Sequence, residues 1–169
     1  MKKRLLMLMV CLFLLPRALA AAPIEKEDMI FLFDGKAYTV GEEANPLLSA
    51  LEARYGKGIE TQTESCLFTG MDKEFDFGEV LIGTYPIGRA GGDVLESIIV
   101  LEGELKTSRG IGIGASLEEV ETAYGSDYVL DYNQITFCGG DPLTEPVLVF
   151  FLDLKANAVS GFFLMGNVN

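Results

Sequence analysis

The sequence predicts an α+β fold made of tandem repeats, in each of which a short helix packs on an antiparallel sheet. Three observations predict this fold. Two short segments carry helix start and stop signals, strand-like stretches follow each of them, and this order of elements occurs twice. The predicted organisation is a leader at 1–20, a lead-in with a first strand at 21–37, and repeats at 38–106 and 107–169.

The first twenty residues have the features of a signal peptide. Basic residues at 2–4 precede an apolar run over 5–15, and small residues near Ala20 suit signal peptidase. The run is shorter than the ~20 residues that a bilayer span needs. We therefore expect an exported protein, cleaved after Ala20 or Ala22, that lies outside the cell, in the cell envelope or in the periplasm. After cleavage we expect no stable membrane insertion.

The composition excludes several classes of function. The whole chain has a formal net charge of −12, and without the leader's four basic residues nine bases face 25 acids. No histidine is present, which removes Ser-His-Asp and Cys-His catalytic pairs and histidine metal sites. An acidic chain also lacks the cations that neutralise nucleic-acid phosphates. We expect no nucleic-acid partner, no metal and no cofactor, whereas a basic protein partner fits the charge.

Two helices are indicated by their end signals. Asn45 is a suitable N-cap for a helix that ends before Gly56. Ser116 and Glu119 have the spacing of a capping box, and Gly125 follows the end of that second helix. Because each helix has a single apolar stripe, we expect each to pack on its own sheet.

Strand patterns fill the rest of the chain. Asp34-Gly35 is a type I′ turn pair between two short strands, and residues before Ile30 have no pattern and suggest a disordered lead-in. Period-two alternation over 72–77 places Phe75 and Phe77 on one face and the acidic residues on the other. Further strand-like stretches cover 65–68, 80–85, 94–101, 128–137, 147–154 and 159–165.

Several of these segments resemble a recurring signature of exported bacterial proteins. They are Thr107 to Gly114, the helix start at Leu117 to Val120, the Tyr124-Gly125 pair, and Ser65 to Lys73. The sequence is similar to the beta-lactamase inhibitor protein family and to the BamE outer-membrane assembly family. This resemblance implies tandem helix-plus-sheet repeats, a non-enzymatic role, and sheets that present a surface to a protein partner.

The chain departs from these families at two points. Val10 precedes Cys11 where a lipoprotein signal has a small residue, which separates the chain from the lipid-anchored branch. No tryptophan is present, although protein interfaces depend on aromatic anchors. The resemblance is therefore carried over for fold and broad role, and no target is carried over.

Two cysteines remain after the leader, Cys66 and Cys138. An even, small number in an exported protein favours one disulfide between them. Two buried free thiols are the alternative.

Aromatic side chains are the candidate recognition residues. Phe150-Phe151 and Phe162-Phe163 are adjacent pairs on strands, so one member of each pair points away from the helix-covered side. The candidate protein-binding residues are Tyr85, Tyr128, Tyr132 and Phe75, because aromatic residues combine a large apolar area with, in tyrosine, a polar tip.

The glycines at 110–114 satisfy a dinucleotide fingerprint, but no buried parallel strand precedes them. The acidic residues from Asp72 onward fail as a calcium loop, because Gly83 occupies the position of the chelating glutamate.

We therefore predict a non-catalytic protein-binding module and no enzyme, either an inhibitor or a cell-envelope scaffold. The alternatives are a carboxylate-dependent hydrolase outside the cytoplasm and a structural envelope protein that binds copies of itself. The oligomeric state is left open.

Overall fold

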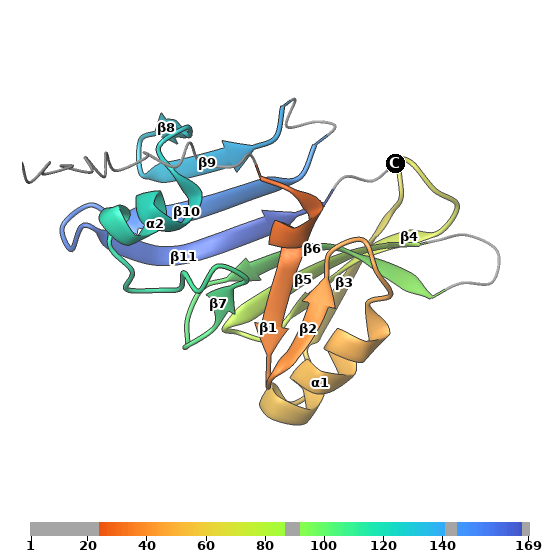
Figure 1. Cartoon of the computed structure of the whole chain (residues 1–169). Coiled ribbons are helices and arrows are strands. Elements are labelled where there is room, and N and C mark those ends of the chain that lie inside the picture. The colour runs from red at the N-terminus through yellow and green to blue at the C-terminus, as the bar shows by residue number, and fades with distance from the viewer. Residues whose placement is uncertain (1–23, 87–91, 141–144, 167–169) are drawn as a thin grey trace, which may run out of the picture.

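The computed structural model describes residues 24–86, 92–140 and 145–166, and Figure 1 shows how the chain is arranged. Its large sheet is antiparallel, with the strand order β3-β4-β5-β6-β11-β10-β9-β8, and a small sheet has the order β2-β1-β7. In chain order the elements are η1 (Lys26–Met29), β1 (Ile30–Phe33), β2 (Lys36–Thr39), α1 (Asn45–Tyr55), β3 (Ile59–Glu64), β4 (Met71–Asp76), β5 (Val80–Pro86), β6 (Asp93–Val100), β7 (Lys106–Thr107), α2 (Leu117–Tyr124), β8 (Val129–Asp131), β9 (Gln134–Cys138), β10 (Val147–Asp153) and β11 (Ala158–Met165).

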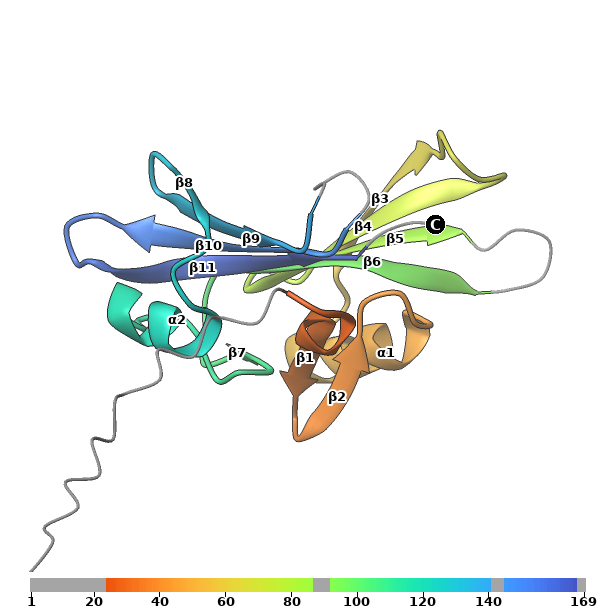
Figure 2. The same cartoon turned by 45° about the horizontal axis from the view of Figure 1, so that its top comes forward.

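One face of the large sheet is covered and the other is not. Figure 2 shows α1, α2 and the small sheet on the same side, and no helix or strand of the described residues lies over the opposite side. The covered side holds the core, a single hydrophobic cluster that includes Leu51 from α1, Val120 from α2 and Phe150 from β10. An antiparallel sheet with one covered face is a common arrangement, since its strands alternate between core and solvent.

The predicted fold class is wrong. The described chain is mostly β, with 47% strand and 17% helix, and it is not a tandem of short helices on separate sheets. The pairing of β6 with β11 overturns the prediction, because Ile99 lies opposite Phe163 and joins all eight strands into one sheet. The predicted boundary between residues 106 and 107 falls inside β7, which pairs with β1 of the lead-in.

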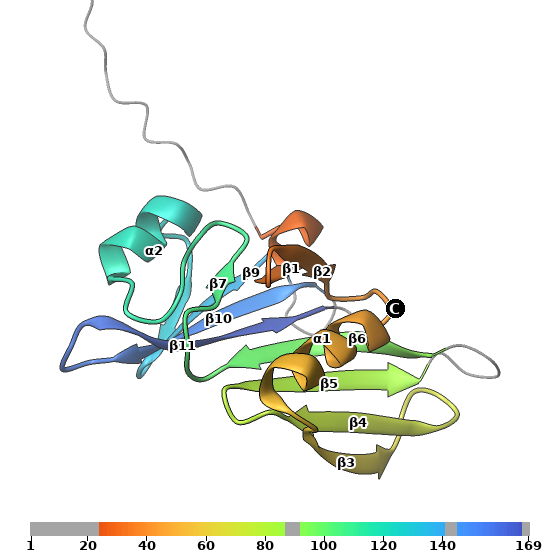
Figure 3. The same ribbon diagram turned by 90° about the horizontal axis from the view of Figure 1, so that it is seen from below.

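The helix boundaries follow the end signals, with one exception. In α2 the predicted capping box is confirmed, since Ser116 Oγ accepts from the Glu119 N–H and the Glu119 carboxylate accepts from the Ser116 N–H. Tyr124, the last residue of α2, packs against β9 and β10, where its ring makes tilted contacts with Phe137 and Phe150. Figure 3 shows both helices in front of the sheet, seen from the side that they cover. The Asn45 cap is wrong, because Ala44 occupies the N-cap position of α1 without a side-chain hydrogen bond.

Two turns decide how the first strands are placed. The predicted type I′ turn is confirmed, since Asp34 and Gly35 both have positive φ, 48° and 75°, between the paired β1 and β2. The predicted strand at 65–68 is wrong. Ser65 Oγ accepts from the Phe68 N–H and closes a turn, and the strand lies before it, at β3.

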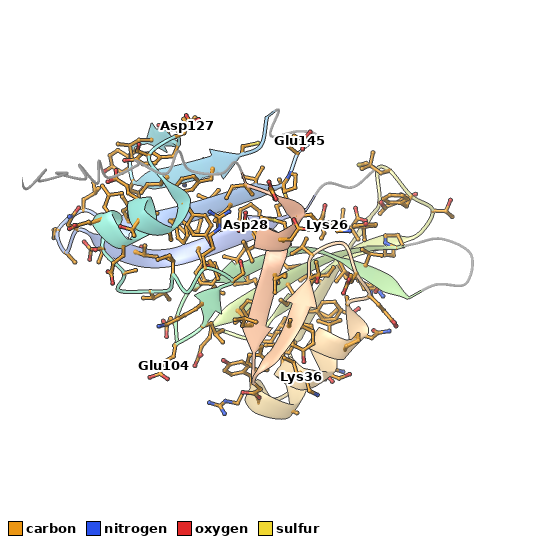
Figure 4. All side chains as sticks on the ribbon, viewed as in Figure 1. Lys26, Asp28, Lys36, Glu104, Asp127 and Glu145 are labelled. Carbon is orange, nitrogen blue, oxygen red and sulfur yellow. The ribbon has the colours of Figure 1, made fainter. Side chains whose placement is uncertain are left out.

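The lead-in is more ordered than the sequence suggests. Asp28 and Met29 of η1 are buried, and Arg109 donates to both carboxylate oxygens of Asp28 at 2.6 Å. Figure 4 marks Asp28 where η1 meets the part of the molecule around α2. The predicted leader lies outside the described residues, and none of the described helices is long and apolar enough to cross a membrane.

Candidate protein-binding surface

The candidate site is the face of the large sheet that neither helix covers, called here the uncovered face. Residues directly opposite each other in an antiparallel pair point to the same side of the sheet. Val80 and Ile82 of β5 point into the core, so Leu81 between them points to the uncovered face. The strand register then identifies the rest of this face.

An unbroken row of side chains crosses the uncovered face from one edge to the other. Its four central side chains are apolar, three of them half-buried and one buried. A polar residue follows on each side, and an exposed apolar residue lies at each edge of the sheet. From β3 to β8 the row is Ile59, Asp76, Leu81, Ile99, Phe163, Val149, Thr136 and Val129. We call Leu81, Ile99, Phe163 and Val149 the apolar row.

The predicted orientation of the adjacent phenylalanines is confirmed. Phe150 and Phe162 are fully buried on the core side, whereas Phe151 and Phe163 are half-buried and point to the uncovered face. A contiguous apolar surface with a polar border is typical of a protein-binding site.

Carboxylates gather beside the apolar row at the β3–β4 end. Asp72, Glu74 and Asp76 share the uncovered face of β4, as the alternation predicts. Glu96 joins them from β6, because Gly83 pairs with Ser97 and Thr84 with Leu95, which leaves Glu96 as the extra residue of a bulge.

Three of these carboxylates, those of Asp72, Glu74 and Glu96, line a shallow hollow of about 260 Å³ together with Lys73 and hydroxyl-bearing side chains. Burial, and then repulsion by Asp72, raises the pKa of Glu96 above its ordinary value. Among the described residues, Asp72 Oδ1 is buried and has no hydrogen-bond partner. The lining also includes Thr61, Thr63 and Ser97. This hollow therefore carries a net negative charge, and one of its carboxylate oxygens, Asp72 Oδ1, receives no hydrogen bond.

The structure does not bring the four candidate aromatic residues together. Tyr85 stacks on Phe68 with ring centroids 5.0 Å apart, and its pKa is raised by burial and then by Glu96. Tyr132 is 85% exposed at the turn between β8 and β9. Tyr128 donates a hydrogen bond to Glu121 at 2.8 Å, which raises the pKa of the tyrosine. Phe75 packs against the core on the covered side of β4.

The residues of the apolar row escaped the sequence analysis. Leu81 and Ile99 lie in strands that are apolar on both faces, and such strands have no alternation from which to read the exposed side. Their partial exposure follows from the absence of a second layer among the described elements, and no local pattern encodes that.

The predicted disulfide between Cys66 and Cys138 is not present, and both cysteines are free. Cys66 lies in the turn before β4 and Cys138 ends β9, five strands away in the sheet. At about 4.8 Å per strand the separation is about 24 Å, whereas a disulfide needs Cα atoms within about 7 Å. One disulfide within this fold is therefore excluded by geometry.

Comparison with family models, curated proteins and solved structures finds no match to this chain. The resemblance to the beta-lactamase inhibitor protein and BamE families therefore stays a prediction.

Proposed function

We propose that the protein is an exported, non-catalytic protein-binding module that contacts its partner through the uncovered face. The observation that carries the proposal is the apolar row, in which Leu81, Ile99 and Phe163 lie side by side on a face without a covering layer among the described elements. Burial of such side chains supplies most of the free energy of protein association.

The charge distribution supports a partner with a basic surface. The whole chain has a net charge of −12, and the carboxylates of β4 and Glu96 border the apolar row. A complementary positive patch would increase the rate of association and fix the orientation of the complex. Both an inhibitor and a cell-envelope scaffold need such a surface, and the predicted leader supports export for either.

The experiment is affinity capture of partners by the tagged full chain from the native host. Leu81→Asn and Ile99→Asn place a polar amide in the apolar row, and each is expected to lower partner recovery about tenfold, the loss of one interface anchor. Leu32→Asn is the matched control, because Leu32 is a 43% exposed aliphatic residue of β1 in the small sheet, on the opposite side of the molecule. Equal recovery with all three variants, each with an unchanged melting temperature, would contradict the proposal.

A carboxylate-dependent hydrolase is the second candidate, and one observation favours it. Glu96 has a raised pKa next to Asp72, as a general acid beside a second carboxylate has. The hollow lacks an apolar wall, however, since hydroxyl groups of Thr61, Thr63 and Ser97 line it. Turnover of envelope glycans by the purified protein, abolished by Glu96→Gln and retained by Glu102→Gln, would establish this candidate over the binding module.

A further inference from the structure

Strand β3 lies at one edge of the large sheet, and its two charged residues, Glu60 and Glu64, are both acidic. Among the described strands it pairs with β4 alone, and all six of its residues are exposed. Natural edge strands are usually short or carry charged side chains (above all lysine), proline or a bulge, which hinder pairing with another chain. Acidic side chains hinder pairing with an acidic strand and leave the edge open to a basic one. β8, at the opposite edge, has only three residues, whereas β3 has six, contains no lysine or proline, and pairs with β4 without a register shift.

The backbone groups that β3 presents to solvent can be identified. The Ser65 N–H donates to the Gly70 carbonyl, and the Phe77 N–H donates to the Val80 carbonyl, both at 3.0 Å. Because hydrogen-bonded pairs alternate along an antiparallel ladder, both bonds imply that the N–H and C=O groups of Ile59, Thr61 and Thr63 point to β4. Those of Glu60, Gln62 and Glu64 then point outward, where an added strand would bind them.

The charge around this edge favours a cationic strand. β3 and β4 contain five carboxylates and one ammonium group. The ammonium group, Lys73, points to the covered side and forms an ion pair with Asp93 at 2.6 Å. A second copy of this chain would bring the same carboxylates to the edge, and like charges on paired strands are destabilising.

Side chains of an added strand would also reach the hollow. On the uncovered face Thr61 lies opposite Glu74 and Thr63 lies opposite Asp72. The added strand would lie about 10 Å from β4, two strand spacings away, with only short threonine side chains between. A lysine or arginine side chain extended over them would reach the hollow that Asp72 and Glu74 line, where a carboxylate accepts a charge-assisted hydrogen bond.

We infer that β3 is a docking edge for an extended, basic segment of a partner protein, which adds to the large sheet as a ninth strand and extends lysine or arginine side chains into the hollow beside Asp72 and Glu74. This inference rests on the proposed function and names the chemistry of the partner. Main-chain hydrogen bonds supply affinity in this mode of recognition, and alternate side chains supply specificity.

The test uses the full chain and a blocked seven-residue peptide of alternating threonine and lysine, with binding followed by fluorescence anisotropy. Gln62→Pro removes the central outward N–H without removing a bond to β4, and proline is tolerated at an edge where the N–H faces solvent. It is expected to weaken binding at least about tenfold, whereas Gln62→Ala removes only the side chain and should leave the affinity within about twofold. The double variant Asp72→Asn/Glu74→Gln is expected to weaken binding about fivefold.

A second probe keeps the protein unchanged. A peptide N-methylated at the alternate residues that face β3 loses the same hydrogen bonds, so it should bind at least about tenfold more weakly than the parent peptide. Equal affinity for both peptides, or no binding of the parent peptide at millimolar concentration, would overturn the inference. A dimer of the protein that Gln62→Pro dissociates would also overturn it, in favour of a second copy at this edge.

The two proposals fail separately. Leu81→Asn lies outside the edge and should leave peptide binding unchanged while lowering partner capture. If the unmodified protein does not bind the parent peptide but Leu81→Asn still lowers partner capture, the docking edge alone is rejected. If the peptide binds as expected but Leu81→Asn leaves partner capture unchanged, the uncovered face is rejected as the partner site.

Discussion

Arg109 and Asp28 form a two-pronged ion pair, with Nε to Oδ1 and Nη2 to Oδ2 both at 2.6 Å. Arg109 also donates from Nη1 to the Ala123 carbonyl at 2.9 Å and lies 4.7 Å from the centre of the Tyr124 ring. The hydrogen bond to Asp28 raises the pKa of the guanidinium group above its ordinary value. Asp28 and Arg109 are 81 residues apart in the chain, and through the Ala123 carbonyl Arg109 joins the N-terminal segment to α2.

Asp28→Asn is expected to lower the free energy of unfolding by about 2–3 kcal/mol. The loss is large because the guanidinium group stays partly buried without its counter-ion, and it is below that of a fully buried pair because the Arg109 side chain is 27% exposed. Urea unfolding measures the change. Glu27→Gln, at an exposed acid of the same short helix, is the control and should have little effect. Equal stabilities of the two variants would show that the pair contributes nothing.

Phe150→Ala is expected to lower the free energy of unfolding by about 3–5 kcal/mol, because Phe150 is fully buried and its removal leaves a cavity. Phe151→Ala should lower it by only about 1 kcal/mol, since Phe151 points to the uncovered face. Thermal and urea unfolding of the two neighbouring variants compare the two sides of β10 directly. If the larger loss followed Phe151→Ala, the assignment of the two faces would be reversed.

Glu96→Gln is expected to stabilise the protein at pH 7 by about 0.5 kcal/mol. The pKa of Glu96 is raised in the folded protein, so the folded state binds more protons than the unfolded state between 4.5 and the raised value. Stability therefore decreases as pH rises through that window, and glutamine removes this loss. Urea unfolding at pH 4 and pH 7 should show the gain only at pH 7, and Glu102→Gln is the exposed control. A gain of equal size at both pH values would contradict the assigned burial of Glu96.

Cys66 and Cys138 are expected to remain thiols in the folded protein. The exposed Cys66 should react with a thiol reagent faster than the half-buried Cys138, whose Sγ lies 3.3 Å from the Gly140 carbonyl oxygen. Intact mass spectrometry of the chain without its predicted leader, which contains Cys66 and Cys138, should give the same mass before and after reduction. A gain of two hydrogens on reduction would contradict the free thiols of the structure.

Local signals in the sequence predict local structure well. Asp34-Gly35 and the Ser116–Glu119 pair each act within four residues, so their chemistry determines the turn and the helix start regardless of the rest of the chain. β3 was missed because period-two alternation requires one buried face, and the edge strand is exposed on both. The predicted strand at 65–68 is apolar enough for a strand, but the Ser65 hydroxyl closes a turn there.

Long-range pairing accounts for the remaining differences. The single sheet depends on Ile99 meeting Phe163, a contact between residues 64 positions apart that no local pattern encodes. The hollow depends on a bulge that places Glu96 on the uncovered face, and the alternation of β6 alone does not reveal it. That one member of each adjacent phenylalanine pair points away from the core was predictable, because neighbours on a strand point to opposite faces. Which member does so follows from the register of the sheet.

The central claim, that the uncovered face binds a protein partner, is tested most directly by site-specific photo-crosslinking in the native host. A photoreactive residue is placed at Thr136, on the uncovered face of β9, or at Glu118, exposed on α2 at the opposite side. The account predicts an adduct of one defined mass with a second protein from position 136 and none from position 118. Adducts from position 118 alone, or adducts only with further copies of this chain, would contradict it.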